Sequence, residues 1–104
     1  MKAKKELLVY TVKENIRCAF ITYSPTFDDK DDQDIILKDN HSKKDLAAFL
    51  RALSFEYDNG YGRQFIYGTV WLKDGNWLER REYDGSEWWV HQVLPKLPKE
   101  CQDV

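Results

Sequence analysis

The chain has 104 residues, 42% of them apolar, which is enough for one hydrophobic core, so we expect a single domain over residues 1–104. Charged residues make up 33% of the chain, but 16 Lys and Arg against 18 Asp and Glu leave a net charge of -2. This balance argues against a general binder of nucleic acid or anionic membranes, which carries a basic excess, and against a DNA mimic, which carries a dense acidic one.

The N-terminal part predicts a β-hairpin over residues 7–23. Leu7 to Val12 and Ile16 to Tyr23 are rich in β-branched and aromatic residues, and the polar residues 13–15 separate them as a turn. The first six residues lack the apolar run of a secretory signal, and no stretch reaches the roughly 18 to 20 apolar residues of a membrane span. We therefore expect a cytoplasmic protein.

Residues 24–41 are predicted to form an exposed acidic loop, because clustered carboxylates repel one another and offer nothing to bury. The cluster consists of Asp28, Asp29, Asp31, Asp32 and Asp34. The short apolar run 35–37 favours a brief edge strand. Hard metal ions prefer clustered carboxylates, but the spacing lacks the Gly and Glu of an EF-hand loop. We favour a solvated loop, or electrostatic steering toward a basic partner surface.

The segment 42–58 predicts an amphipathic α-helix. Ser42 and Asp45 have the spacing of a capping box, which marks a helix start. Apolar residues then recur at intervals of three and four and form one stripe that should pack on a sheet: Leu46, Phe49, Leu50, Leu53 and Tyr57. Asn59-Gly60 favours the helix end.

Residues 64–94 predict a three-stranded antiparallel meander. Strands at 64–73, 76–83 and 86–94 are joined at Asp74-Gly75 and Asp84-Gly85, and Asp-Gly is a strong signal for a two-residue hairpin turn. Pro95 and Pro98 should end the last strand and begin an extended tail over 95–104. The expected fold class is α+β, with an N-terminal hairpin, one helix and a C-terminal meander.

Two-residue turns would place Leu72 opposite Trp77 and Arg80 opposite Trp89, which sorts the meander into two faces. The more aliphatic face should meet the helix: Ile66, Val70, Leu72, Trp77, Tyr83, Trp88 and Val90, with Glu79 and Arg81 among them. The other face mixes rings and charges, as protein interfaces do: Phe65, Tyr67, Thr69, Trp71, Leu78, Arg80, Glu82, Glu87, Trp89 and His91. A one-residue bulge in either turn would exchange the faces of a strand.

The candidate partner-binding residues come from this second face and from the acidic loop. They are Asp28, Asp29, Asp31, Asp32, Asp34, Tyr67, Trp71, Arg80, Trp89 and His91. The alternative for the aromatic residues is structural, because cross-strand pairs of Trp and Arg also stabilise a small sheet.

No catalytic, metal or cofactor motif accompanies these residues. Cys18, Cys101, His41 and His91 lack the paired spacing of a zinc site, and we expect the two cysteines to be free thiols. There is no nucleophile motif, P-loop or dinucleotide fingerprint. We therefore expect a binding protein without a cofactor rather than an enzyme.

The run from Gly68 to Arg80, its continuation from Glu82 to Trp89 and the segment Pro95-Lys96-Leu97-Pro98 resemble a signature in small accessory proteins of tailed bacteriophages. The resemblance covers the C-terminal third of the chain. It implies a protein that acts in the cytoplasm of a bacterial host, where it binds and sterically inhibits a host protein or ribonucleoprotein complex, such as a CRISPR or other defence system.

The residues themselves leave a second function open. Aromatic rings on a sheet can stack on the bases of single-stranded nucleic acid, and Arg63, Arg80 and Arg81 would neutralise the phosphates. The near-neutral composition disfavours this alternative.

Overall fold

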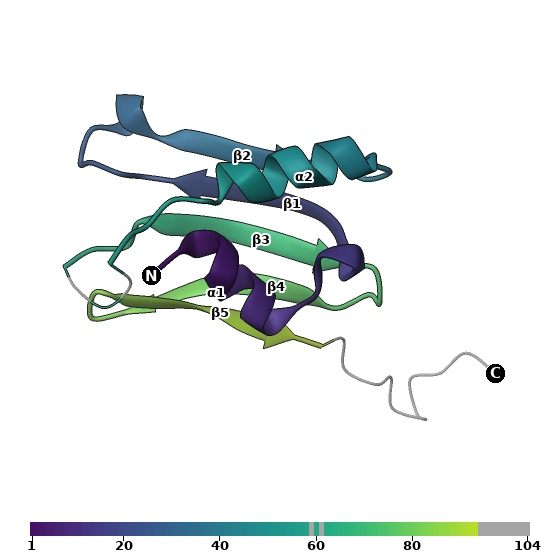
Figure 1. The fold of residues 1–104 in the computed structure, drawn as a ribbon. Helices are drawn as coiled ribbons and strands as arrows, with labels where there is room; N and C mark the ends of the chain where they lie inside the picture. Colours follow the sequence, from purple (N-terminus) through teal and green to yellow (C-terminus); the bar gives the residue numbers. More distant parts are fainter. Residues whose placement is uncertain (59, 61, 94–104) are drawn as a thin grey trace, which may run out of the picture.

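The structure, a computed structural model, describes residues 1–58, 60 and 62–93. These residues form a five-stranded antiparallel sheet with two α-helices packed on one of its faces (Figure 1). The spatial strand order is β2-β1-β3-β4-β5. The strands are β1 (Ile16–Tyr23), β2 (Gln33–Leu37), β3 (Ile66–Leu72), β4 (Trp77–Tyr83) and β5 (Ser86–Gln92). The α+β class predicted from the sequence is confirmed.

The first helix, α1 (Ala3–Tyr10), occupies the place of the first predicted strand, so the predicted N-terminal hairpin is wrong. Its first-turn amides are bonded by distant carbonyls, since the Ala3 N–H donates to the Phe55 carbonyl at 3.0 Å and the Lys4 N–H to the Leu53 carbonyl at 2.9 Å. These carbonyls replace a side-chain N-cap, which α1 lacks. The helix start therefore carries no local sequence signal.

Strand β1 pairs with β2 on one side and with β3 on the other, rather than with residues 7–12. The edge strand expected at 35–37 is present as β2. Between β1 and β2 the chain is exposed over residues 26–32, where it forms a short 3-10 helix, Asp29–Asp31. A second 3-10 helix, Lys13–Asn15, connects α1 to β1.

The second helix, α2 (Lys43–Ala52), begins as predicted. Ser42 and Asp45 form both hydrogen bonds of the capping box. The helix ends at Ala52 and not at residue 58, because the chain then runs beside the N-terminus, where Glu56 bridges Lys2 and the Tyr57 N–H donates to the Met1 carbonyl at 3.0 Å. The predicted stop signal at Asn59 lies outside the described residues.

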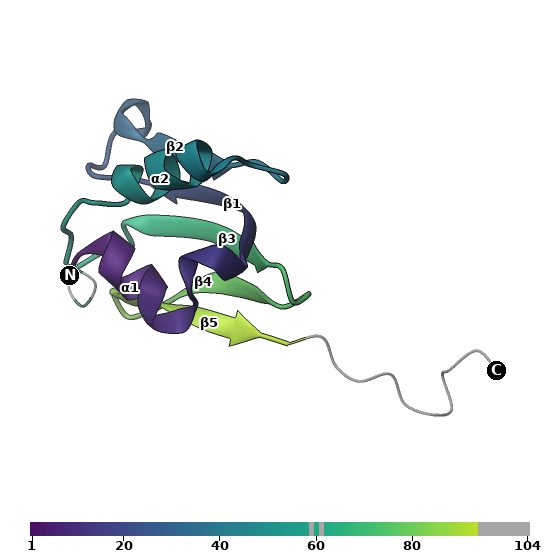
Figure 2. The same ribbon diagram turned by 45° about the vertical axis from the view of Figure 1, so that its right-hand side comes forward.

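The hydrophobic core lies between the two helices and the sheet face that they cover (Figure 2). The stripe predicted on the helix packs into it, since Phe49, Leu50, Leu53 and Tyr57 are buried. The sheet supplies most of the other core side chains: Ile16, Ala19, Ile21, Ile35, Leu37, Ile66, Val70, Leu72, Leu78 and Trp89.

The centre of the sheet depends on a glycine. Gly68 of β3 has φ +133°, and a Cβ at this position would lie 2.1 Å from the Phe20 carbonyl oxygen of β1. Only glycine permits this close approach of the two backbones.

The C-terminal meander is present, but its first turn is one residue longer than predicted. The Leu72 N–H donates to the Asn76 carbonyl at 2.9 Å, the Gly75 N–H donates to the Leu72 carbonyl at 3.2 Å, and Gly75 has φ +92°. This is a three-residue loop with glycine in the left-handed region, so Trp71 rather than Leu72 pairs with Trp77. The second turn has two residues as predicted, with positive φ at Asp84 and Gly85.

The extra residue exchanges the faces of β4 and β5 relative to β3. Ile66, Val70 and Leu72 face the core as predicted. The core positions expected for Trp77, Tyr83, Trp88 and Val90 were wrong, because this register turns Leu78, Arg80, Glu87 and Trp89 inward instead. The predicted tail at 95–104 lies outside the described residues.

Candidate functional site

The sheet face opposite the helices is not covered by any element of the described chain (Figures 1 and 2). We call it the open face. The strand register assigns to it Cys18, Phe20, Thr22, Asp34, Ile36, Tyr67, Thr69, Trp71, Trp77, Glu79, Arg81, Tyr83, Ser86, Trp88, Val90 and Gln92. One row crosses all five strands, from Ile36 through Phe20, Thr69 and Glu79 to Val90.

Aromatic side chains dominate the open face. Phe20, Tyr67, Trp71, Tyr83 and Trp88 are all exposed, with exposed fractions from 37% for Trp88 to 77% for Tyr83. Trp77 is half-buried and pairs across the strands with Trp71. Rings held on paired strands lose little conformational freedom on binding, and they offer a large contact area.

The charge of the open face is nearly balanced. Its charged residues among the described strands are Asp34, Glu79 and Arg81. Glu79 accepts a hydrogen bond from the Trp77 indole at 2.8 Å and lies 3.5 Å from the Arg81 guanidinium. Asp34 accepts one from the Thr22 hydroxyl at 3.0 Å. The face is therefore aromatic and close to neutral, without a basic track.

The predicted partner-binding residues divide between several places. Tyr67 and Trp71 lie on the open face and are exposed. Arg80 and Trp89 lie on the opposite face, where the Arg80 side chain is 1% exposed and Trp89 is 2% exposed, so neither reaches a partner at the surface. His91 is exposed on the same side as the helices, opposite Leu78.

The five predicted aspartates are all exposed. Asp28 accepts the Lys30 N–H at 3.0 Å and Asp31 accepts the Thr26 hydroxyl at 2.7 Å, so two of them stabilise their own loop. Asp34 belongs to the open face. Within the described ranges, no three His, Cys, Asp or Glu side chains gather as they would around a metal ion.

Arg80 is the centre of a buried polar cluster that joins four parts of the chain. Its guanidinium donates to Glu6 of α1 at 2.9 Å and to Glu87 of β5 at 2.7 Å, and it also bonds the Tyr57 hydroxyl. Tyr57 in turn donates to Glu6. Glu87 accepts the N–H groups of Phe65 and Ile66 at 2.6 and 3.0 Å, where β3 has no pairing with β4.

The electrostatics of this cluster indicate a structural role. Burial opposes the charged form of Arg80, but the Glu6 charge and the hydrogen bonds to Glu87 outweigh it and raise its pKa. Burial, with the hydrogen bond to Glu6, also raises the pKa of Tyr57 far above its ordinary value. The side chains of Glu6, Arg80 and Glu87 are no more than 6% exposed, so the cluster is poorly placed to exchange protons with a substrate.

Sequence reasoning missed four aromatic residues of the open face: Phe20, Trp77, Tyr83 and Trp88. The last three were assigned to the core because the first turn was taken as two residues long. The loop from Lys73 to Gly75 carries a usable signal, since a glycine in the third position also suits a three-residue hairpin loop. Phe20 alternates with buried Ala19 and Ile21, as expected for a strand with one exposed face.

Comparison of the chain with protein-family models, with curated proteins and with solved structures found no match. In the described residues, no helix is long and apolar enough to span a membrane.

Proposed function

We propose that this protein acts by binding another protein through the open face. The observation that carries this proposal is the set of five exposed aromatic rings on one uncovered sheet face: Phe20, Tyr67, Trp71, Tyr83 and Trp88. Several exposed aromatic residues on one surface mark interaction sites in soluble proteins, and Tyr and Trp are the residues most enriched at their energetic centres.

A protein partner is favoured over single-stranded nucleic acid by the charges around the rings. The nucleic-acid alternative needs arginines beside the stacking platform. Arg80 is buried on the other side of the sheet, and Arg63 donates to Ser24 at 2.8 Å and lies over the Phe27 and Phe65 rings. Arg81 remains, and two carboxylates on the same face, those of Asp34 and Glu79, offset it.

The finer role follows from the resemblance of residues 68–98 to small accessory proteins of tailed bacteriophages. In this proposal the open face covers a working surface of a host protein or ribonucleoprotein complex, such as a CRISPR or other defence system, and inhibits it sterically. Inhibition of this kind needs a large complementary surface and no catalytic group.

The proposal is tested with two baits that differ only on the open face. One bait is the wild-type protein and the other is its Tyr67→Ser/Trp71→Ser variant. Each is immobilised and incubated with a bacterial lysate, and the proteins that it retains are quantified by mass spectrometry. Both residues are exposed, so the variant should keep its fold, which circular dichroism and melting check. We expect at least one protein that the wild type retains and the variant loses, and that binds the purified wild type with about tenfold or higher preference over the variant.

Three results would contradict the proposal. The first is equal retention of every protein by both baits. The second is binding of a labelled single-stranded oligonucleotide that needs Tyr67 and Trp71 and weakens steeply with salt, which would indicate a nucleic-acid site. The third is self-association of the wild type that the double substitution abolishes in sedimentation experiments, which would make the open face a contact between copies of the chain.

A further inference from the structure

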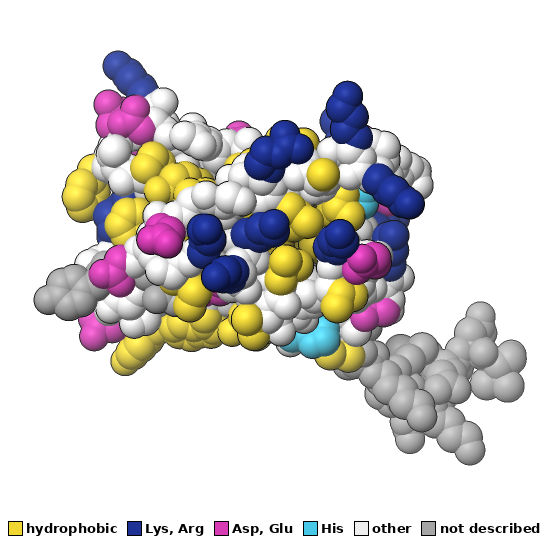
Figure 3. All heavy atoms as spheres, viewed as in Figure 1, with side chains coloured by type: hydrophobic (Ala, Val, Ile, Leu, Met, Phe, Trp, Pro, Cys, Tyr) yellow, Lys and Arg dark blue, Asp and Glu magenta, His cyan; other side chains and the backbone are white. Residues whose placement is uncertain are grey.

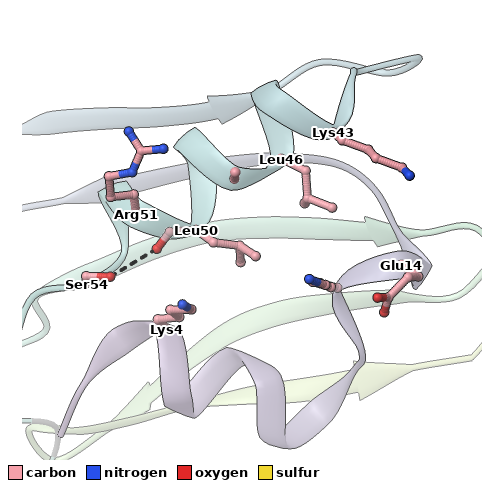
Figure 4. Close-up of a pocket in the computed structure, with 9 residues that line it drawn as sticks. Lys4, Glu14, Lys43, Leu46, Leu50, Arg51 and Ser54 are labelled. Carbon is pink, nitrogen blue, oxygen red and sulfur yellow. Dashed lines mark hydrogen bonds between the residues drawn. The ribbon is translucent and has the colours of Figure 1, made fainter.

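A groove runs between α1 and α2 on the side of the molecule opposite the open face (Figure 4). It has a volume of about 610 Å³. Leu46 and Leu50 of α2 point into it and form an apolar floor, to which Ala47 contributes. Leu50 is 6% exposed and belongs to the core, so the floor is continuous with the interior of the protein.

The rim of the groove is basic. Four cations line it: Lys4 of α1, Lys13 of the following 3-10 helix, and Lys43 and Arg51 of α2. Among the described lining residues they face one carboxylate, Glu14. None of these four cations forms an ion pair within the part of the chain that the structure describes. Figure 3 shows that Lys and Arg side chains gather on this side, over and between the helices.

This concentration of positive charge is unusual because the whole chain carries a net charge of -2. Cations placed side by side without partners repel one another, and the repulsion is relieved when anionic groups dock between them. The four cations occupy both walls of the groove, whereas the acidic cluster of residues 28–34 lies in the loop between β1 and β2 and at the start of β2. The positive charge of the groove therefore favours an acidic ligand.

The shape and lining indicate which acidic ligand fits. The described residues of the lining include no aromatic ring on which a base could stack. A concave site with an aliphatic floor also does not match the flat surface of a membrane. An acidic amphipathic peptide segment matches both the apolar floor and the basic rim of the groove. Its apolar side chains would contact Leu46 and Leu50, and its carboxylates would face the cations. Helices bind in grooves of other proteins in this way. The ten residues of α2 span roughly 15 Å, which accommodates a helical segment of similar length.

We propose that the groove between α1 and α2 is a docking site for an acidic amphipathic segment of a partner protein. The site is separate from the open face and does not depend on the function proposed for it. A protein with both surfaces would hold two segments on opposite sides of its sheet.

The test uses a displayed library of random peptides of about 12 residues, a length that spans α2. It is selected on the wild-type protein, and the best sequence is synthesised with a fluorescent label for anisotropy measurements. We expect the selected peptides to be enriched in Asp and Glu, with apolar residues at spacings of three and four. Replacing the acidic residues of the labelled peptide by Gln and Asn should weaken binding about tenfold or more and flatten its salt dependence.

Matched variants locate the site. Lys43→Glu/Arg51→Glu reverses the charge of two exposed rim residues and should weaken peptide binding about tenfold or more. Lys44→Glu changes an adjacent exposed lysine that does not line the groove and should leave binding nearly unchanged, as should the open-face variant Tyr67→Ser/Trp71→Ser. Melting measurements confirm that each variant is folded.

The proposal is overturned if the selection returns no acidic enrichment, or if the rim variant and Lys44→Glu bind the peptide equally well. It is also overturned if labelled oligothymidine or vesicles of anionic phospholipid bind through Lys43 and Arg51 more tightly than the selected peptide. Loss of peptide binding in the open-face variant alone would show that the peptide binds the open face and not the groove.

Discussion

Arg80 shows how one side chain organises several elements of this protein. It carries the positive charge between Glu6 and Glu87, and its guanidinium also lies 5.0 Å from the centre of the Trp89 ring. Glu87 satisfies two backbone amides at the start of β3 that have no partner on β4. The cluster therefore connects α1, the segment after α2 and the two C-terminal strands through buried hydrogen bonds.

Replacing Arg80 should destabilise the fold much more than replacing its neighbour. Arg80→Gln removes the cation that bonds the buried Glu6 and Glu87 carboxylates, and loss of one partner costs about 3 to 5 kcal/mol in comparable buried pairs. Arg81 is 55% exposed and pairs with Glu79 at 3.5 Å, so Arg81→Gln should change the free energy of unfolding by about 0.5 kcal/mol or less. Urea denaturation of both variants measures the difference. Similar effects of the two substitutions would contradict the structural role of Arg80.

The two helices begin by different physical means. α2 is capped locally, since the Ser42 hydroxyl accepts the Asp45 N–H and the Asp45 carboxylate accepts the Ser42 N–H, both at 3.1 Å. α1 is capped by the carbonyls of Leu53 and Phe55, which reach it only after the chain has folded. The start of α2 is therefore visible in the sequence and that of α1 is not.

The capping box gives α2 a pH dependence. The hydrogen bonds from Ser42 lower the pKa of Asp45 below its ordinary value of about 3.9. The ionised carboxylate therefore stabilises the folded state above about pH 4, and this contribution is lost as the pH falls through the lowered pKa.

We expect Asp45→Asn to be less stable than the wild type near neutral pH, with a difference that shrinks as the pH falls from about 6 to about 2. Urea denaturation of both proteins across this range measures the difference. A difference that does not change with pH would show that the charge of Asp45 has no role in the cap.

At the scale of the whole molecule, the described residues form two layers, in which the helices cover one face of the sheet and no described element covers the other. Both helices cover the same side, and the apolar groove between them carries a basic rim. The other side presents aromatic rings and nearly balanced charges. The two proposed binding surfaces thus lie on opposite sides of one sheet and differ in chemistry.

Adjacent tryptophans of β5 test this architecture. Trp89 is 2% exposed and faces the helices, so Trp89→Ala should reduce the free energy of unfolding by about 3 to 5 kcal/mol. Trp88 lies on the open face and is paired with Arg81, so Trp88→Ala should cost about 1 kcal/mol or less. Thermal or urea denaturation separates the two. If Trp88→Ala were the more damaging substitution, the assignment of the faces would be wrong.

Features that depend on a few neighbouring residues could be predicted from the sequence. They are the capped start of α2, the apolar stripe of Phe49 and Leu50, the two-residue turn at Asp84-Gly85, the strands of the meander and the short strand β2. Tyr67 and Trp71 could also be placed on one exposed face. In each case a local pattern of capping, periodicity or backbone conformation specifies the structure.

Only the tertiary structure decided the helical state of residues 3–10 and the faces of β4 and β5. Leu7 to Val12 have the composition of a strand, but distant carbonyls, the buried contacts of Leu7 and the ion pair between Glu6 and Arg80 stabilise a helix. In the meander, one additional turn residue exchanged inward and outward positions, which buried Arg80 and Trp89 and exposed Trp88. Because side chains alternate along a strand, a turn that is longer by one residue reverses which side chains of the following strands face the core, whatever their hydrophobicity.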